Sequence, residues 1–346
     1  MPALIYPAGL LLALHLGGAG CWLLVPFNLL LVPLADQLLD AVRWQPSPRL
    51  LRSCFAPWVY WIYAAAQLGA LLAALHAICL RNLSLLEWMG LVSSTGLMTG
   101  TAGITAAHEL IHRTSPAQRG LGLALLAMTS YMHFRIEHVY GHHRFAGTAR
   151  DAASARLGQS FPGFFLRALL HGGRDAWRIE RARLARAGRS AWSPRNRLLH
   201  YLLLQGAVYA AAAWFGGWMA PLFLLLQSLM AVHLLEAVNY VQHYGLRREA
   251  GAGGEPRRMR AADSWDSTSP LAPLLSFNIV RHAQHHLSVR ERAHQLPVLA
   301  GSPKLPASFF AMVFCALIPP LWHRLMDPRA QAPERYTHTD PRPLTS

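Results

Sequence analysis

The chain has 346 residues, of which 53% are hydrophobic and only 14% are charged. Charged residues make up about a quarter of an average soluble protein, so this composition indicates a membrane protein. The formal net charge of +15 does not require a nucleic-acid partner, because the basic residues cluster between apolar runs, as expected from positive-inside topology. The four isolated cysteines form no C-x-x-C pair, which excludes the usual zinc-ribbon and iron–sulfur patterns.

Apolar runs long enough to cross a bilayer recur along the chain. Residues 4–39 form one tilted span or, as we favour because glycines interrupt them, a hairpin of two short spans. Further apolar helices are predicted at residues 55–80, 85–107, 121–134, 198–215, 219–243 and 308–326, the last broken by Pro319 and Pro320. Together they predict an all-α integral membrane bundle of about six transmembrane helices. We expect a single domain of residues 1–329 and a disordered tail of residues 330–346.

The charges between the apolar runs predict the orientation of the bundle. Arginine-rich gaps occur at residues 43–52, 113–119, 174–197 and 247–260. The gaps near Asn82 and Gly216 are short and carry little charge. Positive-inside topology therefore places the arginine-rich gaps in the cytoplasm, for a multi-pass protein of a bacterial-type inner membrane.

Nine of the 18 histidines gather in four short clusters, all at or near the predicted cytoplasmic level. They are His108 and His112; His138, His142 and His143; His243; and His282, His285 and His286. Residues four apart share one face of a helix, and neutral imidazole is the commonest protein metal ligand. Since unpaired polar groups are costly at membrane depth, we predict a metal site. Nine ligands exceed the coordination of one ion, so two metals are expected.

The histidine clusters are also compatible with functions other than a two-metal site. HELIH at residues 108–112 matches the zinc-protease pattern H-E-x-x-H, but that reading leaves seven clustered histidines unexplained. Imidazole suits both zinc and iron, so ligand type does not identify the metal. A metal transporter would distribute its ligands along a pathway near the bilayer midplane, whereas these are predicted at one level.

The motifs HELIHR, EHVYGHH, NYVQHYG and RHAQHH resemble the histidine boxes of membrane alkane 1-monooxygenases, within the fatty-acid desaturase and hydroxylase superfamily. DAASARLGQS at 151–160, DSWDS at 263–267 and IPPLWHRLMDPR at 318–329 extend the resemblance. The same motifs also resemble those of the related xylene monooxygenase branch.

The resemblance implies a non-haem di-iron enzyme that uses O2 to hydroxylate an unactivated C–H bond, such as the terminal methyl group of an n-alkane. Its two iron ions would be held by the nine clustered histidines. Glu109 and Glu137 are expected to accept a hydrogen bond from the ring N–H of a ligand histidine that does not face the metal. Asp151, Asp263 and Asp266 are further candidates for the same role. A fatty acyl desaturase of the same superfamily remains an alternative, which product analysis would separate.

Electrons must come from a partner, because the chain has no dinucleotide-binding, flavin or iron–sulfur motif. The family uses rubredoxin or a ferredoxin-type donor with an NAD(P)H reductase. Arginines at 174–197 and 247–260 would attract such an acidic carrier, or would instead bind anionic membrane lipid. Candidates for lining a hydrocarbon channel are Trp58, Trp61, Trp88, Thr95 and Met98, although packing or lipid contact is the commoner role of such residues.

Overall fold

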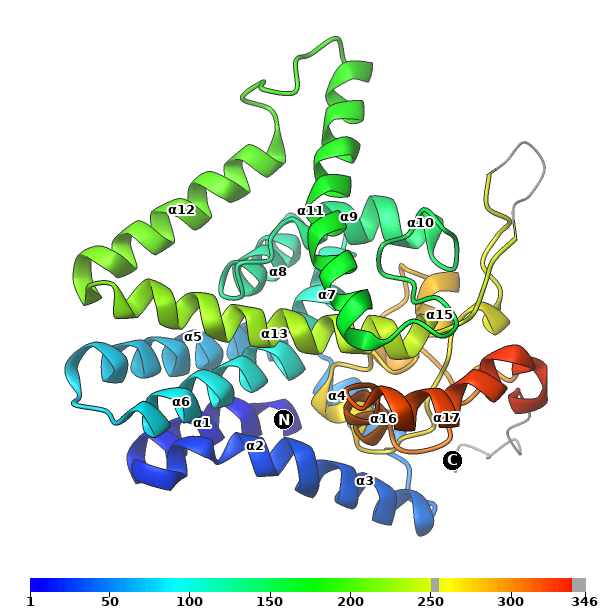
Figure 1. The fold of residues 1–346 in the computed structure, drawn as a ribbon, viewed down its shortest axis with the longest axis horizontal. Coiled ribbons are helices and arrows are strands. Elements are labelled where there is room, and N and C mark those ends of the chain that lie inside the picture. The colour runs from blue at the N-terminus through cyan, green and yellow to red at the C-terminus, as the bar shows by residue number, and fades with distance from the viewer. Residues whose placement is uncertain (250–254, 338–346) are drawn as a thin grey trace.

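The computed structural model describes residues 1–249 and 255–337, and these residues form helices joined by turns and loops, with no β-strand (Figure 1). The predicted all-α class is confirmed. The first helices are α1 (Ile5–Leu16), α2 (Leu24–Pro26), α3 (Val32–Ala41), α4 (Pro48–Cys54), α5 (Pro57–Leu80), α6 (Leu85–Met98), α7 (Thr105–Ile111) and α8 (Pro116–Ala127). The later ones are α9 (Phe134–Glu137), α10 (His143–Phe145), α11 (Phe161–Arg186), α12 (Arg197–Gly216), α13 (Met219–His243), α14 (Ala272–Leu275), α15 (His282–Leu287), α16 (Phe309–Ala316) and α17 (Pro319–Gln331).

The N-terminal apolar stretch is a hairpin, the arrangement favoured from its glycines. The chain reverses at Gly17 and Gly18, whose φ angles of 61° and 50° lie in the region that glycine occupies at least cost. It returns through the 3-10 turn η2 (Gly18–Trp22), α2, the π-helical η3 (Phe27–Leu31) and α3. The returning arm is a candidate membrane span of 24 residues, whereas Pro2–Leu16 is a shorter apolar helix.

Helix α13 lies at the centre of the bundle, where it packs against α5, α6, α11, α12 and α16 (Figure 1). Within residues 1–249 and 255–337, four helical segments are long and apolar enough to cross a membrane: Gly18–Ala41, Pro57–Leu80, Arg197–Gly216 and Met219–His243. A fifth is present if α16 and α17, bent by 118° at the predicted proline break, count as one span. The predicted number of about six spans is higher because it also counted the apolar helix Pro2–Leu16, which is shorter than a span, and residues 85–107.

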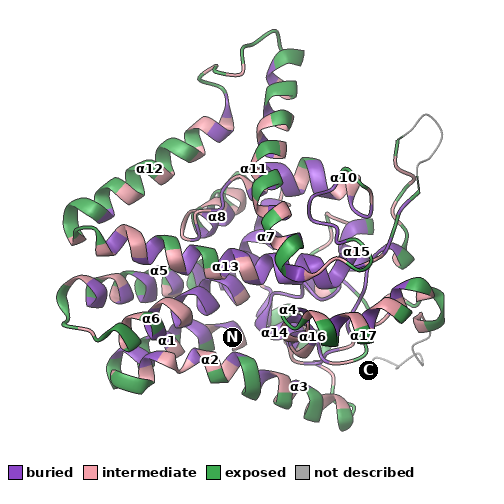
Figure 2. Ribbon diagram, in the orientation of Figure 1, coloured by how far each residue is buried: buried purple, intermediate pink, exposed green. Residues whose placement is uncertain are grey.

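Residues 85–107 are helical throughout, through α6, the π-helical η4 (Thr99–Ile104) and α7, but are not among these candidate spans. Their hydroxyl groups explain why. Ser94, Thr95 and Thr99 are fully buried. The Ser94 hydroxyl donates to the carbonyl of Cys21, and the Thr99 hydroxyl contacts the carbonyl of Thr95 and Oε1 of Gln227. From Gly90 to Ala107 this segment is mostly buried against other helices, whereas Leu85 and Leu86 at its start are exposed, so most of it does not need a continuous apolar surface (Figure 2).

The C-terminal boundary also differs from the prediction, which placed a disordered tail from residue 330. Helix α17 continues to Gln331, and a 3-10 turn, η9, covers Pro333–Tyr336. Ala330 is buried, and the Lys304 N–H donates to the carbonyl of Tyr336 at 3.0 Å, which holds this segment against the body. The predicted tail beyond Thr337 lies outside the described residues.

A buried carboxylate joins α11 to α12. Glu180 is fully buried and accepts hydrogen bonds from Arg183, at 3.0 Å from Nε, and from Arg197, at 2.8 Å from the backbone N–H. These partners lower the pKa of Glu180 to about 2, although burial opposes the shift. Glu180 and its two arginine partners therefore fix the start of α12 relative to the basic end of α11.

We expect Glu180→Gln to destabilise the protein by about 2 kcal/mol, because Arg197 loses its charged partner. The folded-state pKa of Glu180 lies below its ordinary value, so this stabilisation is complete above about pH 4.5 and is lost as the pH falls towards 2. Thermal unfolding in detergent from pH 7 to pH 3 measures it. Glu255→Gln is the control, since Glu255 pairs with Arg144 at an exposed site. Equal midpoints for the two variants at pH 7 would contradict the assignment.

Candidate metal centre

The structure brings the nine clustered histidines together as two adjoining groups. The five-histidine group contains His108, His112, His138, His143 and His285. The four-histidine group contains His142, His243, His282 and His286. Within each group one ligand atom of every residue lies within 4.8 Å of the others. The groups touch where the rings of His143 and His286 approach to 4.5 Å between centroids.

Four elements supply these side chains from distant parts of the sequence. Helix α7 ends beside His108 and His112, and α13 ends at His243. The π-helical turn η5 (His138–His142) runs into α10, and the short helix α15 begins at His282. The histidines therefore cluster where α7 and α13 end, as the predicted common level requires.

The π-helical turn divides the second cluster differently from the prediction. The spacing of His138 and His142 places them on one face of an ordinary α-helix, but the structure assigns them to different groups. A π-turn has about one more residue per turn, so His138 aligns with His143, five positions later. Helix α15 contributes to both groups as well: His282 and His286 point to one, His285 to the other. Two elements thus serve both groups.

The ring nitrogens converge within each group. Nε2 of His143 lies 3.0 Å from that of His138 and 3.2 Å from that of His285. In the other group, Nε2 of His282 lies 3.0 Å from that of His243 and 2.9 Å from that of His286. Burial, reinforced by neighbouring histidines, lowers the pKa of His138, His285 and His286 well below 6.5, so these rings are neutral at physiological pH.

This donor set fits metal ions. The Nε2 atoms of His108, His112 and His142 are buried without a hydrogen-bond partner in the described residues. Buried polar atoms are normally satisfied, so such a concentration of free imidazole nitrogens fits a site for cations. Nitrogen ligands about 2.1 Å from one ion are at most about 4.2 Å apart, close to the spacing observed. Neither group includes a carboxylate.

One carboxylate contacts a clustered histidine. Asp151 is buried, and its Oδ2 lies 3.0 Å from Nδ1 of His142, which leaves Nε2 of that ring free to face the group. Burial opposes ionisation, but His142 and the Ser154 hydroxyl lower the pKa of Asp151. An ionised carboxylate on Nδ1–H fixes the tautomer and orientation of a ligating imidazole.

The other expected carboxylates do not contact a histidine ring within the described chain. Glu109 pairs with Arg113 and accepts a hydrogen bond from the Ala293 N–H at 2.9 Å. Because consecutive residues of a helix point about 100° apart, the residue after His108 faces away from the histidines. Glu137, which precedes His138, is buried and forms no hydrogen bond to a ring nitrogen within the described residues.

Asp263 and Asp266 act on the backbone around the site. Asp263 pairs with Arg257, with Oδ1 2.6 Å from the guanidinium. Asp266 is fully buried, and its Oδ1 accepts from the Ala283 N–H at 3.1 Å, in the first turn of α15. It thereby positions the helix that carries three of the histidines.

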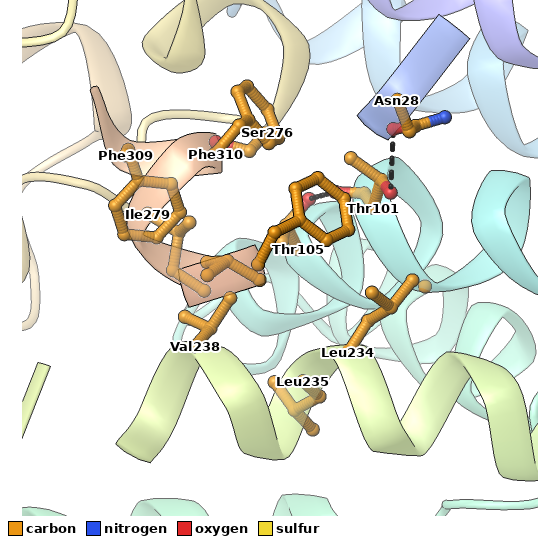
Figure 3. A pocket seen from close by; sticks show the side chains of 13 residues that line it. Asn28, Thr101, Thr105, Leu234, Leu235, Val238, Ser276, Ile279, Phe309 and Phe310 are labelled. Carbon is orange, nitrogen blue, oxygen red and sulfur yellow. Dashed lines mark hydrogen bonds between the residues drawn. The ribbon is translucent and has the colours of Figure 1, made fainter. Parts of the chain in front are cut away.

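An apolar pocket lies alongside the helices that supply the histidines (Figure 3). Thr105, Val238 and Ile279 line it, and they precede His108, His243 and His282 by three, five and three residues. Phe309 and Phe310 of α16 cover one side. At the far end the Thr101 hydroxyl donates to Oδ1 of Asn28 at 3.5 Å. The cavity volume is about 30 Å³, room for one or two waters.

The pocket lining differs from the candidates taken from the sequence. None of Trp58, Trp61, Trp88, Thr95 and Met98 lines this pocket. Trp58 and Trp61 are about half exposed on α5, and Thr95 and Met98 are buried in helix packing. The sequence could have identified these lining residues by their position. Residues one to two turns before a histidine cluster lie at a similar distance from the predicted metal site.

The fold and the two histidine groups define a helical membrane protein with a buried site able to hold two metal ions. A family model described as fatty acid desaturase matches residues 84–315, two thirds of the chain. The chain is 39% identical to alkane 1-monooxygenase 1 of Pseudomonas aeruginosa over 251 residues, 71% of this chain and 66% of the relative. It is 33% identical to alkane 1-monooxygenase 2 of Alcanivorax borkumensis over 316 residues, 90% and 83% of the two chains.

The hydroxylase component of the xylene/toluene monooxygenase of Pseudomonas putida is also similar, at 29% identity over 241 residues, 70% of this chain and 64% of that protein. The higher identities and the greater coverage lie with the alkane enzymes. The chain therefore belongs to the alkane 1-monooxygenase family, within the fatty acid desaturase superfamily.

We expect Asp151→Asn to weaken metal retention by roughly 10- to 100-fold, because His142 loses the anion that orients its ring. Elemental analysis after dialysis against graded chelator measures the loss. Asp263→Asn removes the same charge from a carboxylate bound to Arg257 and is expected to retain metal. If both variants lose metal equally, the contact between Asp151 and His142 has no special role.

Proposed function

We propose that this protein is a membrane non-haem di-iron monooxygenase, which hydroxylates an unactivated C–H bond in a hydrophobic substrate such as an n-alkane. The observation that carries the proposal is the pair of adjoining, buried, all-histidine groups beside an apolar pocket. Membership of the alkane 1-monooxygenase family supports it. The balanced reaction consumes substrate, O2, two electrons and two protons, and yields alcohol and water.

Two iron ions are the proposed metals, held by His108, His112, His138, His143 and His285 in one group and by His142, His243, His282 and His286 in the other. When bound, they supply the redox chemistry that reduces O2, which zinc does not provide. The chain's own contribution is to hold both ions in a dry site. Asp151 orients His142, and Asp266 anchors α15.

The apolar pocket is the proposed substrate site. It lies one to two turns from the histidines along α7 and α13, between these helices and α16. Its volume of about 30 Å³ is too small for a hydrocarbon, so a substrate must displace side chains to enter. Phe309, Phe310, Val313 and Phe314 of α16, an eight-residue helix bent by 118° from α17, form one wall of the pocket and are the side chains proposed to yield. An apolar lining excludes water from the reacting C–H bond.

Electrons are proposed to come from rubredoxin or a ferredoxin-type donor with its NAD(P)H reductase. The arginines of 247–260 follow His243 closely in sequence. Arg248 is buried against the segment after the second cluster, where its guanidinium donates to the carbonyl of Arg144. Arg247, Arg258 and Arg260 are exposed. A basic surface at this place would speed encounter with an acidic carrier. The proposed orientation places this surface in the cytoplasm, at the bacterial inner membrane.

Metal content tests the proposal first. Purified protein in detergent is expected to contain about two iron ions per chain by elemental analysis, with a non-haem signature by Mössbauer spectroscopy. His142→Ala and His282→Ala each remove a predicted ligand and should lose iron and hydroxylation together. His171→Ala is the matched control, because that exposed ring bonds only to the Arg167 carbonyl. Zinc without iron would overturn the oxygenase assignment.

Products identify the reaction. With O2 and a reconstituted reductase, an n-alkane is expected to gain one oxygen at its terminal carbon. An aryl-methyl alcohol formed faster from xylene would favour the xylene-type alternative, and an alkene formed from a fatty acyl chain would favour a desaturase.

Pocket variants test the substrate site. Val238→Phe fills the cavity and should lower kcat/KM for longer alkanes roughly tenfold, while Phe314→Ala should shift preference towards them. Val208→Phe adds the same bulk on partly exposed α12 and should leave chain-length preference unchanged. Iron content is measured alongside, so that a loss of metal is not mistaken for a loss of fit. An unchanged chain-length profile in both pocket variants would place the substrate elsewhere.

A further inference from the structure

A groove opens between α11 and α12, away from the histidine groups. Its volume is about 590 Å³, and its walls differ in chemistry. Arg174, Arg178 and Arg181 of α11 form one wall, and Leu198 and Leu202 of α12 contribute to the other. Figure 1 shows α12 diverging from α13 and running towards the far end of α11.

The basic wall carries charge that the protein does not neutralise. The three arginines are spaced by four and three residues, so they occupy one face of α11. All three are exposed, and Arg174 and Arg181 have no ion pair in the described residues. Arg178 meets Asp175 at 3.3 Å with 64% of its side chain exposed, a contact of little strength.

Two neighbouring arginines are neutralised by a carboxylate: Arg183 and Arg197 both bind the buried Glu180. Arg186, at the end of α11, is exposed and lies outside the groove lining. The groove side of α11 therefore carries three weakly paired or unpaired arginines, and an anionic ligand would complete the pattern.

The apolar wall belongs to the most lipid-exposed span of the protein. Only 11% of the apolar window of α12 is buried, against 61% for α13, and Figure 2 shows α12 largely exposed. Leu198 and Leu202 lie in its first two turns, beside Arg197, so the groove lies at the polar end of a membrane span. Trp177 also lines the groove, and tryptophan is typical of the membrane–water interface.

We propose that this groove binds an anionic phospholipid of the surrounding bilayer, with its phosphate among Arg174, Arg178 and Arg181 and an acyl chain along Leu198 and Leu202. One amphiphile satisfies both walls: guanidinium groups bind phosphate, and leucines contact hydrocarbon. An acidic carrier protein offers charge but no apolar chain for the α12 wall. The site is independent of the proposed oxygenase activity.

A histidine adds a polar contact at the base of the groove. Nε2 of His133 is buried without a hydrogen-bond partner in the described residues, and His133 lines the groove. As a donor it matches a phosphate or ester oxygen. His133 lies five residues before His138, so the occupant would contact the segment that leads into the π-turn of the histidine site.

Native mass spectrometry of the full chain in neutral detergent tests the site, with phosphatidylglycerol and phosphatidylcholine as probes. Wild-type protein is expected to retain phosphatidylglycerol preferentially. The triple variant Arg174→Gln, Arg178→Gln, Arg181→Gln should bind it at least roughly tenfold more weakly. The control is Arg186→Gln, Arg189→Gln, Arg195→Gln, which removes the same charge from exposed positions outside the groove lining and should bind as wild type.

Several outcomes would overturn the proposal. Equal losses in the two triple variants would show general attraction rather than a site, and equal retention of the two lipids would show no anion recognition. Full competition by soluble glycerol phosphate would remove the role of the apolar wall. If the groove variant keeps its lipid but loses turnover only with a protein electron donor, and not with a chemical reductant, the arginines serve the carrier instead. Thermal midpoints in phosphatidylcholine confirm that each variant is folded.

Discussion

Nine imidazole rings lie together in the interior of the protein, and this crowding constrains their protonation and the positions of the helices that carry them. Neighbouring rings with nitrogens about 3 Å apart cannot all carry protons towards one another, and burial disfavours their charged forms. Neutral rings turned inward leave free lone pairs, which metal cations can satisfy together. The apolar helices that hold these rings must therefore end at one level, and α7 and α13 both do so.

The π-helical turn lets one short segment serve both histidine groups. An α-helical turn would direct His138 and His142 to the same side and leave His143 displaced. With the wider turn, His138 and His143 complete one group while His142, held by Asp151, enters the other. Helix α15 divides its three histidines in the same manner, so η5 and α15 keep the groups in contact. A change in either segment would disturb both groups, whereas a change at His243 would act directly on one.

The sequence was sufficient for the class of fold and for which histidines gather, because apolar length and clustered imidazoles are local signals. It was not sufficient for their division into groups, since i, i+4 spacing assumes an α-helical turn and nothing local distinguishes a π-turn at His138. It also favoured Glu109 and Glu137 for their adjacency to histidines, although adjacent helix positions point apart. Asp151, nine residues after His142, reaches the ring only because the chain folds back. Residues 85–107 were predicted as a span from their helical apolar character, but burial by neighbouring helices relaxes the need for hydropathy there.

Arginine clusters in the sequence predict the topology and a basic surface for an acidic carrier or anionic lipid, but they do not separate the individual residues by role as the structure does. Arg183 and Arg197 bind the buried Glu180 and fix α12, whereas Arg174 and Arg181 line an open groove and have no ion pair among the residues that the structure describes. Arg113 is bound to Glu109 and to the loop after α15, so it stabilises the histidine site instead of meeting solvent. The arginines therefore divide by what faces them: a carboxylate, a loop carbonyl or an open groove. On this basis the groove between α11 and α12 and the surface beside the histidine groups are separate basic regions, so lipid and an electron carrier need not compete for the same side chains.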